Sequence, residues 1–120
     1  MNFPLKRVVV TGLGALTPIG NNVSDYWNAL TDGVSGADFI KQFDASKFKT
    51  RFACELKNFN VEDHLDRKEA KKLDRFSQIA MVAAAEAIQQ AGLNDPSLNK
   101  DKIGVIWSSG IGGMITFIEE

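Results

Sequence analysis

The sequence predicts an α/β fold, and three observations lead to this prediction. A β-branched apolar run at residues 8–10 stops at glycines, as a buried strand does where it turns sharply. A long segment with helical signals occupies residues 67–91. A second apolar run, residues 103–107, leads into a glycine-rich turn. Strand, helix and strand in this order are typical of the crossover units of α/β proteins.

A first helix is predicted over residues 23–32. Asn22 is suited to cap its N-terminus, and Asp25, three residues later, favours a helix start electrostatically. Gly33 stands where a left-handed residue commonly ends a helix. The side chains expected to face the core are Tyr26, Trp27 and Leu30.

A short half-buried strand or edge hairpin is predicted at residues 52–56, where apolar residues alternate with others. Cys54 lies within this alternation and is expected to be a small buried hydrophobe rather than a nucleophile. His64 is expected at the surface or as a capping side chain. Because the chain has one Cys and one His, it cannot assemble a His/Cys metal site alone.

The helix predicted over residues 67–91 is the strongest element. Asp66 and Glu69 have the spacing of a capping box, and Gly92 marks the helix end. Residues 79–87 are apolar or small nearly all round, which is typical of a helix buried between layers. Two strands are too few to cover it. We therefore expect an incomplete, N-terminal part of a larger domain, with a small complete domain as the alternative.

Positive charges gather at the start of this predicted helix. At about 100° per residue they fall within an arc of about 140°. A solvated face is the usual interpretation of such a run. However, cations near a helix N-terminus oppose its dipole, which favours a binding role toward an acidic or phosphorylated partner. The five cations are Arg67, Lys68, Lys71, Lys72 and Arg75.

Two glycine-rich turns are candidates for phosphate binding. Gly12 and Gly14 follow a predicted strand, but Thr17 stands where a dinucleotide fingerprint needs its third glycine. A sharp exit from the strand is the simpler interpretation. The turn at residues 108–113 lacks the Lys-Ser/Thr pair of a P-loop and the glycine order of a nucleophile elbow. It is either a tight packing loop or a ligand-pocket wall, with Ile111 as its bulky side chain.

Composition excludes several classes of protein. The 120-residue chain is 44% hydrophobic, which is too apolar for a disordered chain. Its net charge of -1 excludes a generally basic nucleic-acid binder. The apolar runs are too short to span a membrane, and the N-terminus lacks the layout of a signal peptide. A cytoplasmic location is therefore expected.

Five segments, taken in order, carry a resemblance to a known family. They are residues 6–20 (KRVVVTGLGALTPIG), Phe43-Asp44, Phe52-Ala53, the helix start at residues 66–69, and residues 109–113 with Glu119-Glu120. In succession they resemble the opening of the β-ketoacyl-acyl-carrier-protein synthases. The resemblance covers essentially the whole chain and is closest to the elongating synthase II type. Synthase I type enzymes tend to carry another glycine where Ile111 stands.

The resemblance implies a thiolase-like fold of five layers, αβαβα, built from two similar halves. It also implies a decarboxylative Claisen condensation of acyl thioesters with malonyl-acyl-carrier protein, without an organic cofactor, in a homodimeric enzyme. The family's nucleophilic cysteine and two catalytic histidines are expected beyond residue 120, and Cys54 and His64 do not match them. The chain by itself is therefore expected to be inactive.

Two site roles carry over from the family to matching positions. Lys68, Lys71 and Lys72 match residues that dock the acidic helix of acyl carrier protein. Ile111 matches the residue that gates the acyl-chain pocket at the dimer interface. Thr17 departs slightly from the family's pattern, because many relatives have serine at this position, before the proline.

The residues by themselves leave two other functions open. One is a non-catalytic α/β module that binds an acidic protein through its basic helix. The other is a nucleotide-binding domain built on Gly12 and Gly14.

Overall fold

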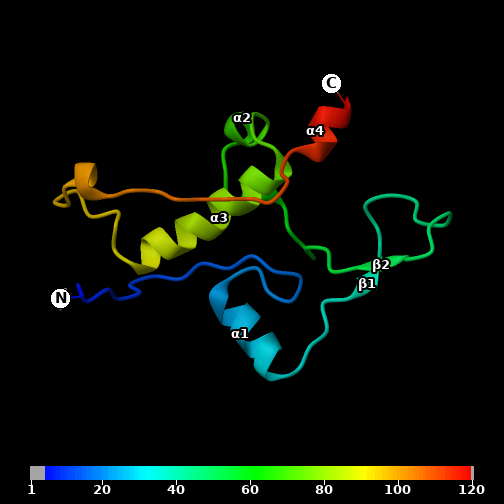
Figure 1. Cartoon of the computed structure of the whole chain (residues 1–120), viewed down its shortest axis with the longest axis horizontal. Helices are drawn as coiled ribbons and strands as arrows, with labels where there is room; N and C mark the ends of the chain where they lie inside the picture. Colours follow the sequence, from blue (N-terminus) through cyan, green and yellow to red (C-terminus); the bar gives the residue numbers. More distant parts are fainter. Residues whose placement is uncertain (1–4, 120) are drawn as a thin grey trace.

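The computed structural model describes residues 5–119, which form helices joined by long extended segments (Figure 1). The strands β1 (Asp38–Phe39) and β2 (Phe52–Ala53) pair antiparallel, with Asp38 opposite Ala53. This short hairpin confirms the edge strand that the alternation at residues 52–56 predicts, in shortened form. The helices are α1 (Val23–Thr31), η1 (Val61–Asp63), α2 (Arg67–Ala70), α3 (Arg75–Gln90), η2 (Lys100–Lys102) and α4 (Met114–Glu119).

Helix α1 begins and ends close to where its sequence predicts. The Asn22 side chain accepts a hydrogen bond of 2.8 Å from the Asp25 amide, and Gly33 has a φ of 68°. The expectation that Trp27 and Leu30 face a core is wrong for this structure, because they are 61% and 48% exposed. Within the described residues, no helix or strand makes an extensive contact with α1.

The helix predicted over residues 67–91 is in fact two helices, α2 and α3. The side-chain amide of Gln78 donates hydrogen bonds to the carbonyls of Ala70 and Leu73, at 2.8 and 3.0 Å. Backbone amides would satisfy these acceptors in a continuous helix, so Gln78 stabilises the break. Asp66 caps α2 by accepting from the Lys68 amide at 2.8 Å rather than from Glu69.

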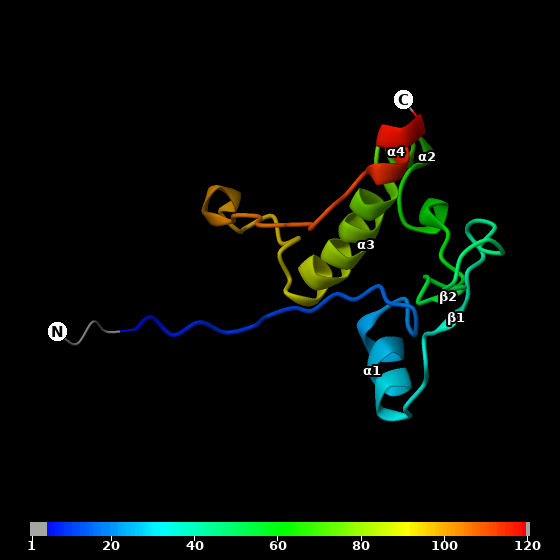
Figure 2. The same ribbon diagram turned by 45° about the vertical axis from the view of Figure 1, so that its right-hand side comes forward.

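The two predicted strands at residues 8–10 and 103–107 run as extended chain (Figures 1 and 2). They belong to no strand of the described residues, so these two predictions are wrong for this structure. Val8 and Ile106 are 89% and 98% exposed. A strand is stabilised by hydrogen bonds to a neighbouring strand, and residues 5–119 supply none here.

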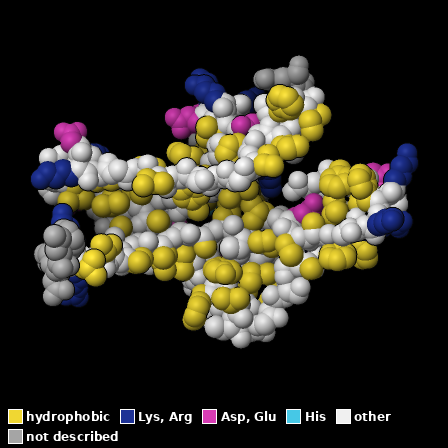
Figure 3. Space-filling view, in the orientation of Figure 1, with side chains coloured by type: hydrophobic (Ala, Val, Ile, Leu, Met, Phe, Trp, Pro, Cys, Tyr) yellow, Lys and Arg dark blue, Asp and Glu magenta, His cyan; other side chains and the backbone are white. Residues whose placement is uncertain are grey.

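Few apolar side chains are enclosed in this part of the chain. Among the described residues, the buried apolar ones are Ala45, Ala70 and Val82. The radius of gyration is 18.0 Å, whereas a compact domain of this length has one of about 13.6 Å. Figure 3 shows hydrophobic side chains spread over the visible surface. The apolar half of α3 is therefore not enclosed by residues 5–119, and its coverage by further layers stays a prediction.

The N-terminal segment crosses α3 at very close range. A Cβ added to Gly12 would collide with the carbonyl oxygen of Ala87, and one added to Gly14 with that of Ala83. The two glycines thus let one backbone lie directly on another. This crossing also argues against a nucleotide site, because the helix backbone occupies the space that a pyrophosphate would need.

Hydrogen bonds from α3 side chains hold this crossing together. The Leu13 amide donates to Gln90 Oε1 at 2.5 Å, and the Ala15 amide donates to Glu86 Oε2 at 2.9 Å. The other carboxylate oxygen of Glu86 accepts from the Val23 amide at 2.9 Å, at the first residue of α1. One side chain therefore fixes the crossing segment and the start of α1 relative to α3.

We expect Gly14→Ala to destabilise the protein by about 1–3 kcal/mol, because the new methyl group cannot fit against the Ala83 carbonyl without moving the backbone. Thermal unfolding of the variant measures this effect as a lower Tm. The matched control is Gly104→Ala, since a Cβ at Gly104 meets no atom within 4 Å. Equal Tm changes in the two variants would contradict the close crossing.

Candidate functional site

The first candidate site is a basic surface on and after α2. Two of the five clustered cations have partners: Arg67 Nε lies 3.4 Å from Glu62 Oε1, and the Arg75 guanidinium lies 5.5 Å from the Phe59 ring centroid. The other three cations are exposed, and within residues 5–119 they form no ion pair. We call these three the basic surface: Lys68, Lys71 and Lys72.

The break between α2 and α3 determines where the basic surface lies. Lys68 is on α2, whereas Lys71 and Lys72 are on the turn that follows it. Ala70 is 3% exposed and anchors the end of α2, while η1 packs beside it. Figure 3 shows dark blue side chains at the upper edge of the molecule, in the region of α2. The sequence predicts that these lysines share one helical face, but they lie on a short helix and the turn after it. Hydrogen bonds from Gln78 hold both the helix and the turn in place.

The second candidate site is the glycine loop, which we define as residues 110–113. Ile111 is 79% exposed, and the loop leads into α4. A Cβ on Gly112 would lie 2.7 Å from Phe76 Cζ, so the loop backbone rests directly on that ring. A cavity of about 160 Å³ lies beside the loop, lined by Asp74, Arg75, Phe76, Ile111, Met114 and Thr116, together with loop glycines. The loop therefore packs on the start of α3 and presents one bulky side chain.

The sequence does not predict the roles of four polar or aromatic residues at these sites. Thr116 donates a hydrogen bond to Asp74 Oδ1, Phe76 supports the loop, and Gln78 pins α2. The one available signal is Asp74, an N-cap type of residue placed inside a predicted helix. The contacts of Thr116, Phe76 and Gln78 join residues that are not neighbours on a regular helix, so no periodic pattern in the sequence predicts them.

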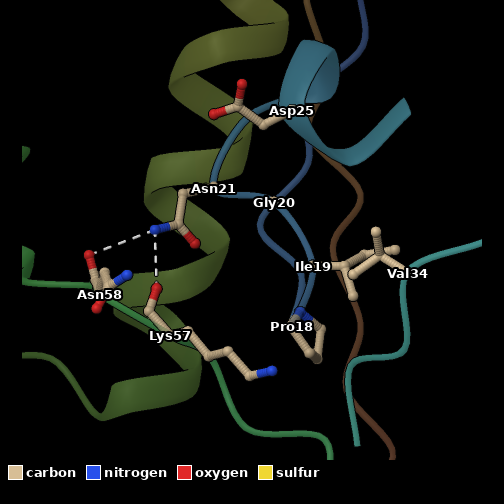
Figure 4. Close-up of a pocket in the computed structure, with 8 residues that line it drawn as sticks. All are labelled: Pro18, Ile19, Gly20, Asn21, Asp25, Val34, Lys57 and Asn58. Carbon is tan, nitrogen blue, oxygen red and sulfur yellow. Dashed lines mark hydrogen bonds between the residues drawn. The ribbon is translucent and has the colours of Figure 1, made fainter. Parts of the chain in front are cut away.

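A second cavity, of about 320 Å³, lies between the segment before α1 and the segment after β2 (Figure 4). Asn21 Nδ2 donates to the carbonyls of Lys57 and Asn58, at 3.0 and 3.3 Å. Asp25 at its rim accepts from Asn22 Nδ2 at 2.7 Å. The two bonds of Asn21 join the segments, so the polar groups of this cavity have a structural role.

The remaining candidate side chains lie apart from both sites. Cys54 is exposed, which overturns the prediction that it is buried, because β2 ends at Ala53 and no layer covers the next residue. His64 is exposed as expected, and its ring stacks on Phe59 with centroids 5.8 Å apart. In the described part of the chain, no group of three or more Asp, Glu, His or Cys side chains is placed to bind a metal.

Three carboxyl groups have a lowered pKa, and each shift is caused mainly by a residue nearby in the sequence. The Lys41 ammonium, donating at 2.9 Å, lowers the pKa of Asp38. The Ser46 amide lowers the pKa of Asp44, and the Ser97 hydroxyl and amide lower that of Asp95. Any stability from these carboxylates is present above about pH 4 and is lost as the pH falls further, when they become protonated. None of them belongs to the basic surface or the glycine loop.

Within residues 5–119, each helix is too short or too polar to cross a lipid bilayer.

The chain is similar in sequence to a known family and to individual members of it. The sequence matches the family described as "Beta-ketoacyl synthase, N-terminal domain" over residues 5–119. It is 53% identical over 112 residues to a 3-oxoacyl-[acyl-carrier-protein] synthase 2 of Staphylococcus aureus (strain COL). It is 51% identical over 113 residues to a protein of the same name from Synechocystis sp.. These alignments cover 93% and 94% of this chain, and the chain spans 27% of each relative.

The structure is also similar to a solved one, titled "The ishigamide ketosynthase/chain length factor". The TM-score is 0.62 at 33% sequence identity, and the match covers 80% of this chain and 23% of the other. This likeness confirms the predicted fold class, an α/β chain of the thiolase-like kind. The family comparison likewise confirms the resemblance that the five sequence segments carry.

We expect Gln78→Ala to loosen α2, because it removes the donors to the Ala70 and Leu73 carbonyls. The cost is about 1–2 kcal/mol for two partly solvated hydrogen bonds. Hydrogen exchange should show faster exchange of the Ala70 amide in α2 and unchanged protection in the middle of α3. Gln89→Ala, at an exposed position near the end of α3, is the matched control. Unchanged exchange in α2 would contradict the role given to Gln78.

Proposed function

Because the chain belongs to the β-ketoacyl synthase family, we propose that it is the N-terminal portion of an acyltransferase that elongates fatty acids. The reaction is the condensation of an acyl thioester with malonyl-acyl-carrier protein. The observation that carries this proposal is the 53% identity to an enzyme named 3-oxoacyl-[acyl-carrier-protein] synthase 2. That relative is nearly four times longer than the matched region, since the chain spans 27% of it.

The proposed chemistry proceeds through a covalent acyl-enzyme. A cysteine thiolate attacks the acyl thioester and releases the carrier-protein thiolate. Malonyl-carrier protein then loses carbon dioxide, and the resulting carbanion attacks the acyl-cysteine carbonyl. This second attack forms the new carbon–carbon bond and returns the cysteine thiolate. Two histidines stabilise the enolate oxygen, and backbone amides bind the tetrahedral oxyanion.

These catalytic groups are proposed to lie outside residues 1–120. Cys54 is exposed at the end of β2 and His64 stacks on Phe59, so neither has the surroundings of an activated nucleophile and its base. The proposal includes a homodimer and a cytoplasmic location, in which an exposed unpaired thiol such as Cys54 persists. It requires no organic cofactor.

Within this enzyme, the basic surface docks the acyl carrier protein. Its three ammonium groups are exposed and have no ion-pair partner among the described residues, so they are free to attract an acidic partner. Asp66 and Gln78 hold α2 and the following turn in place, which fixes the spacing of the charges. A fixed cluster of one sign steers an oppositely charged partner and selects its orientation.

The glycine loop forms the gate of the acyl-chain pocket. Ile111 is its one bulky side chain and is 79% exposed, beside the cavity of about 160 Å³. Because its neighbours Gly110 and Gly112 have no side chains, movement of Ile111 meets little steric resistance from within the loop. Its size therefore sets how long an acyl chain the pocket admits.

We expect reversal of the basic surface (Lys68→Glu, Lys71→Glu and Lys72→Glu together) to raise the KM of the complete enzyme for acyl-carrier-protein substrates about tenfold. The KM for coenzyme A thioesters should change little, because these substrates do not use the docking surface. Steady-state kinetics with both substrate types measures the difference.

The matched control reverses three exposed lysines elsewhere, Lys49, Lys100 and Lys102, and changes the net charge equally. It should leave both KM values near those of the parent enzyme. A rise in KM that is equal for the two substrate types, or equal in the control, would exclude specific docking.

We expect Ile111→Phe in the complete enzyme to restrict the acyl chains that are accepted, because the larger ring blocks the pocket. Longer chains should lose kcat/KM about tenfold relative to the shortest ones. A series of acyl-carrier-protein substrates of increasing length measures the profile. Leu98→Phe, in the loop before η2, is the control and should leave the profile unchanged. An Ile111→Phe enzyme with the parent profile would remove the gate.

A further inference from the structure

The start of α3 contacts both the backbone that carries the basic surface and the glycine loop. On one side, Gln78 hydrogen-bonds to the carbonyls of Ala70 and Leu73 and so pins α2 and its turn. On the other side, Asp74 and Phe76 contact the glycine loop and α4. Three side chains at the start of α3, those of Asp74, Phe76 and Gln78, therefore contact the segments that carry the two candidate sites.

The Asp74 carboxylate is used in an unusual way for its position. Asp74 is the N-cap residue of α3, and such a residue commonly accepts a hydrogen bond from an amide of the first helical turn. Here it makes no side-chain capping bond. Instead its Oδ1 accepts a hydrogen bond from the Thr116 hydroxyl on α4. The carboxylate thus ties the start of α3 to the helix that follows the glycine loop.

The glycine loop is held at a second point by Phe76. The Gly112 backbone rests on the Phe76 ring, and Gly113, with a φ of 70°, places its own backbone near Asp74 Oδ2. Ile111 directly precedes these two glycines and is exposed. Its backbone position is therefore determined by contacts of Gly112 and Gly113, and by α4 beyond them, rather than by packing of its own side chain.

We propose that Asp74 and Thr116 are positioning residues for Ile111. Their hydrogen bond clamps α4 to the start of α3, and the clamp holds the intervening glycine loop on the Phe76 ring. This inference rests on the proposed function, in which Ile111 gates the acyl-chain pocket. Loss of the clamp leaves the Ile111 side chain intact but lets its backbone shift, so that chain-length discrimination weakens.

The test measures the chain-length profile of the complete enzyme with Thr116→Val, which removes the hydroxyl donor and keeps the side-chain shape. We expect the ratio of kcat/KM between preferred and disfavoured chain lengths to fall about fivefold, the effect of losing one hydrogen bond. The fall should be equal with carrier-protein and coenzyme A thioesters, because the clamp acts on the gate and not on docking.

Three further variants make the result specific. Thr116→Ser keeps the hydroxyl and should restore the parent profile. Asp74→Ala breaks the same bond from the acceptor side and should reproduce the Thr116→Val profile, without loss of a capping bond in α3. Thr31→Val removes a hydroxyl that bonds only to carbonyls within α1, and it should leave the profile unchanged.

The outcomes separate this inference from the function on which it rests. If Ile111→Phe alters the profile and both Thr116→Val and Asp74→Ala leave it unchanged, the gate stands and the positioning role is overturned. If Thr116→Ser behaves like Thr116→Val, the hydroxyl is not the cause, and the positioning role is again overturned. If Ile111→Phe itself has no effect, the proposed gate fails, and the inference fails with it.

Discussion

The close crossing of residues 12–15 over α3 is the constraint on which the other positions depend. Gly12 and Gly14 have no Cβ, so their backbone can lie against carbonyls of the helix. The Glu86 carboxylate then accepts amides from Ala15 and from Val23 at the start of α1. Hydrogen bonds to a charged acceptor are stronger than those between neutral groups. Helix α3 is consequently the frame against which the N-terminal segment, α1, α2 and the glycine loop are all placed.

Features that depend on a few neighbouring residues could be predicted from the sequence. The Asn22 cap and the positive φ of Gly33 and Gly92 are where the sequence places them, because capping is decided within about one helical turn. The structural comparison confirms the predicted α/β class, although neither of the two strands used for that prediction is paired in this structure. The strands at residues 8–10 and 103–107 could not be established in this way. A strand forms only when it pairs with a neighbouring strand, and the sequence of one segment does not specify which segment that neighbour is.

At the candidate site, too, the features set by neighbouring residues could be predicted, whereas the contacts made through the fold could not. The cluster of cations at residues 67–75 is visible in the sequence, but the partners that contact two of them are not. Glu62 and Phe59 precede the cluster and reach it only through the fold of the intervening turn. The break after α2 depends on Gln78, whose side chain bonds back across several residues. Helical periodicity assumes that such a side chain points away from the backbone, and therefore predicts one long helix.

The two unpaired apolar segments also have a kinetic consequence. Ribosomes add about 5–20 residues per second, so an N-terminal region emerges long before the end of a protein as long as these relatives. During that interval, on the order of tens of seconds, Val8 and Ile106 remain open to water together with the bare backbone edges beside them. Such edges pair readily with edges of other nascent chains. The region is therefore exposed to such pairing until another strand covers these edges.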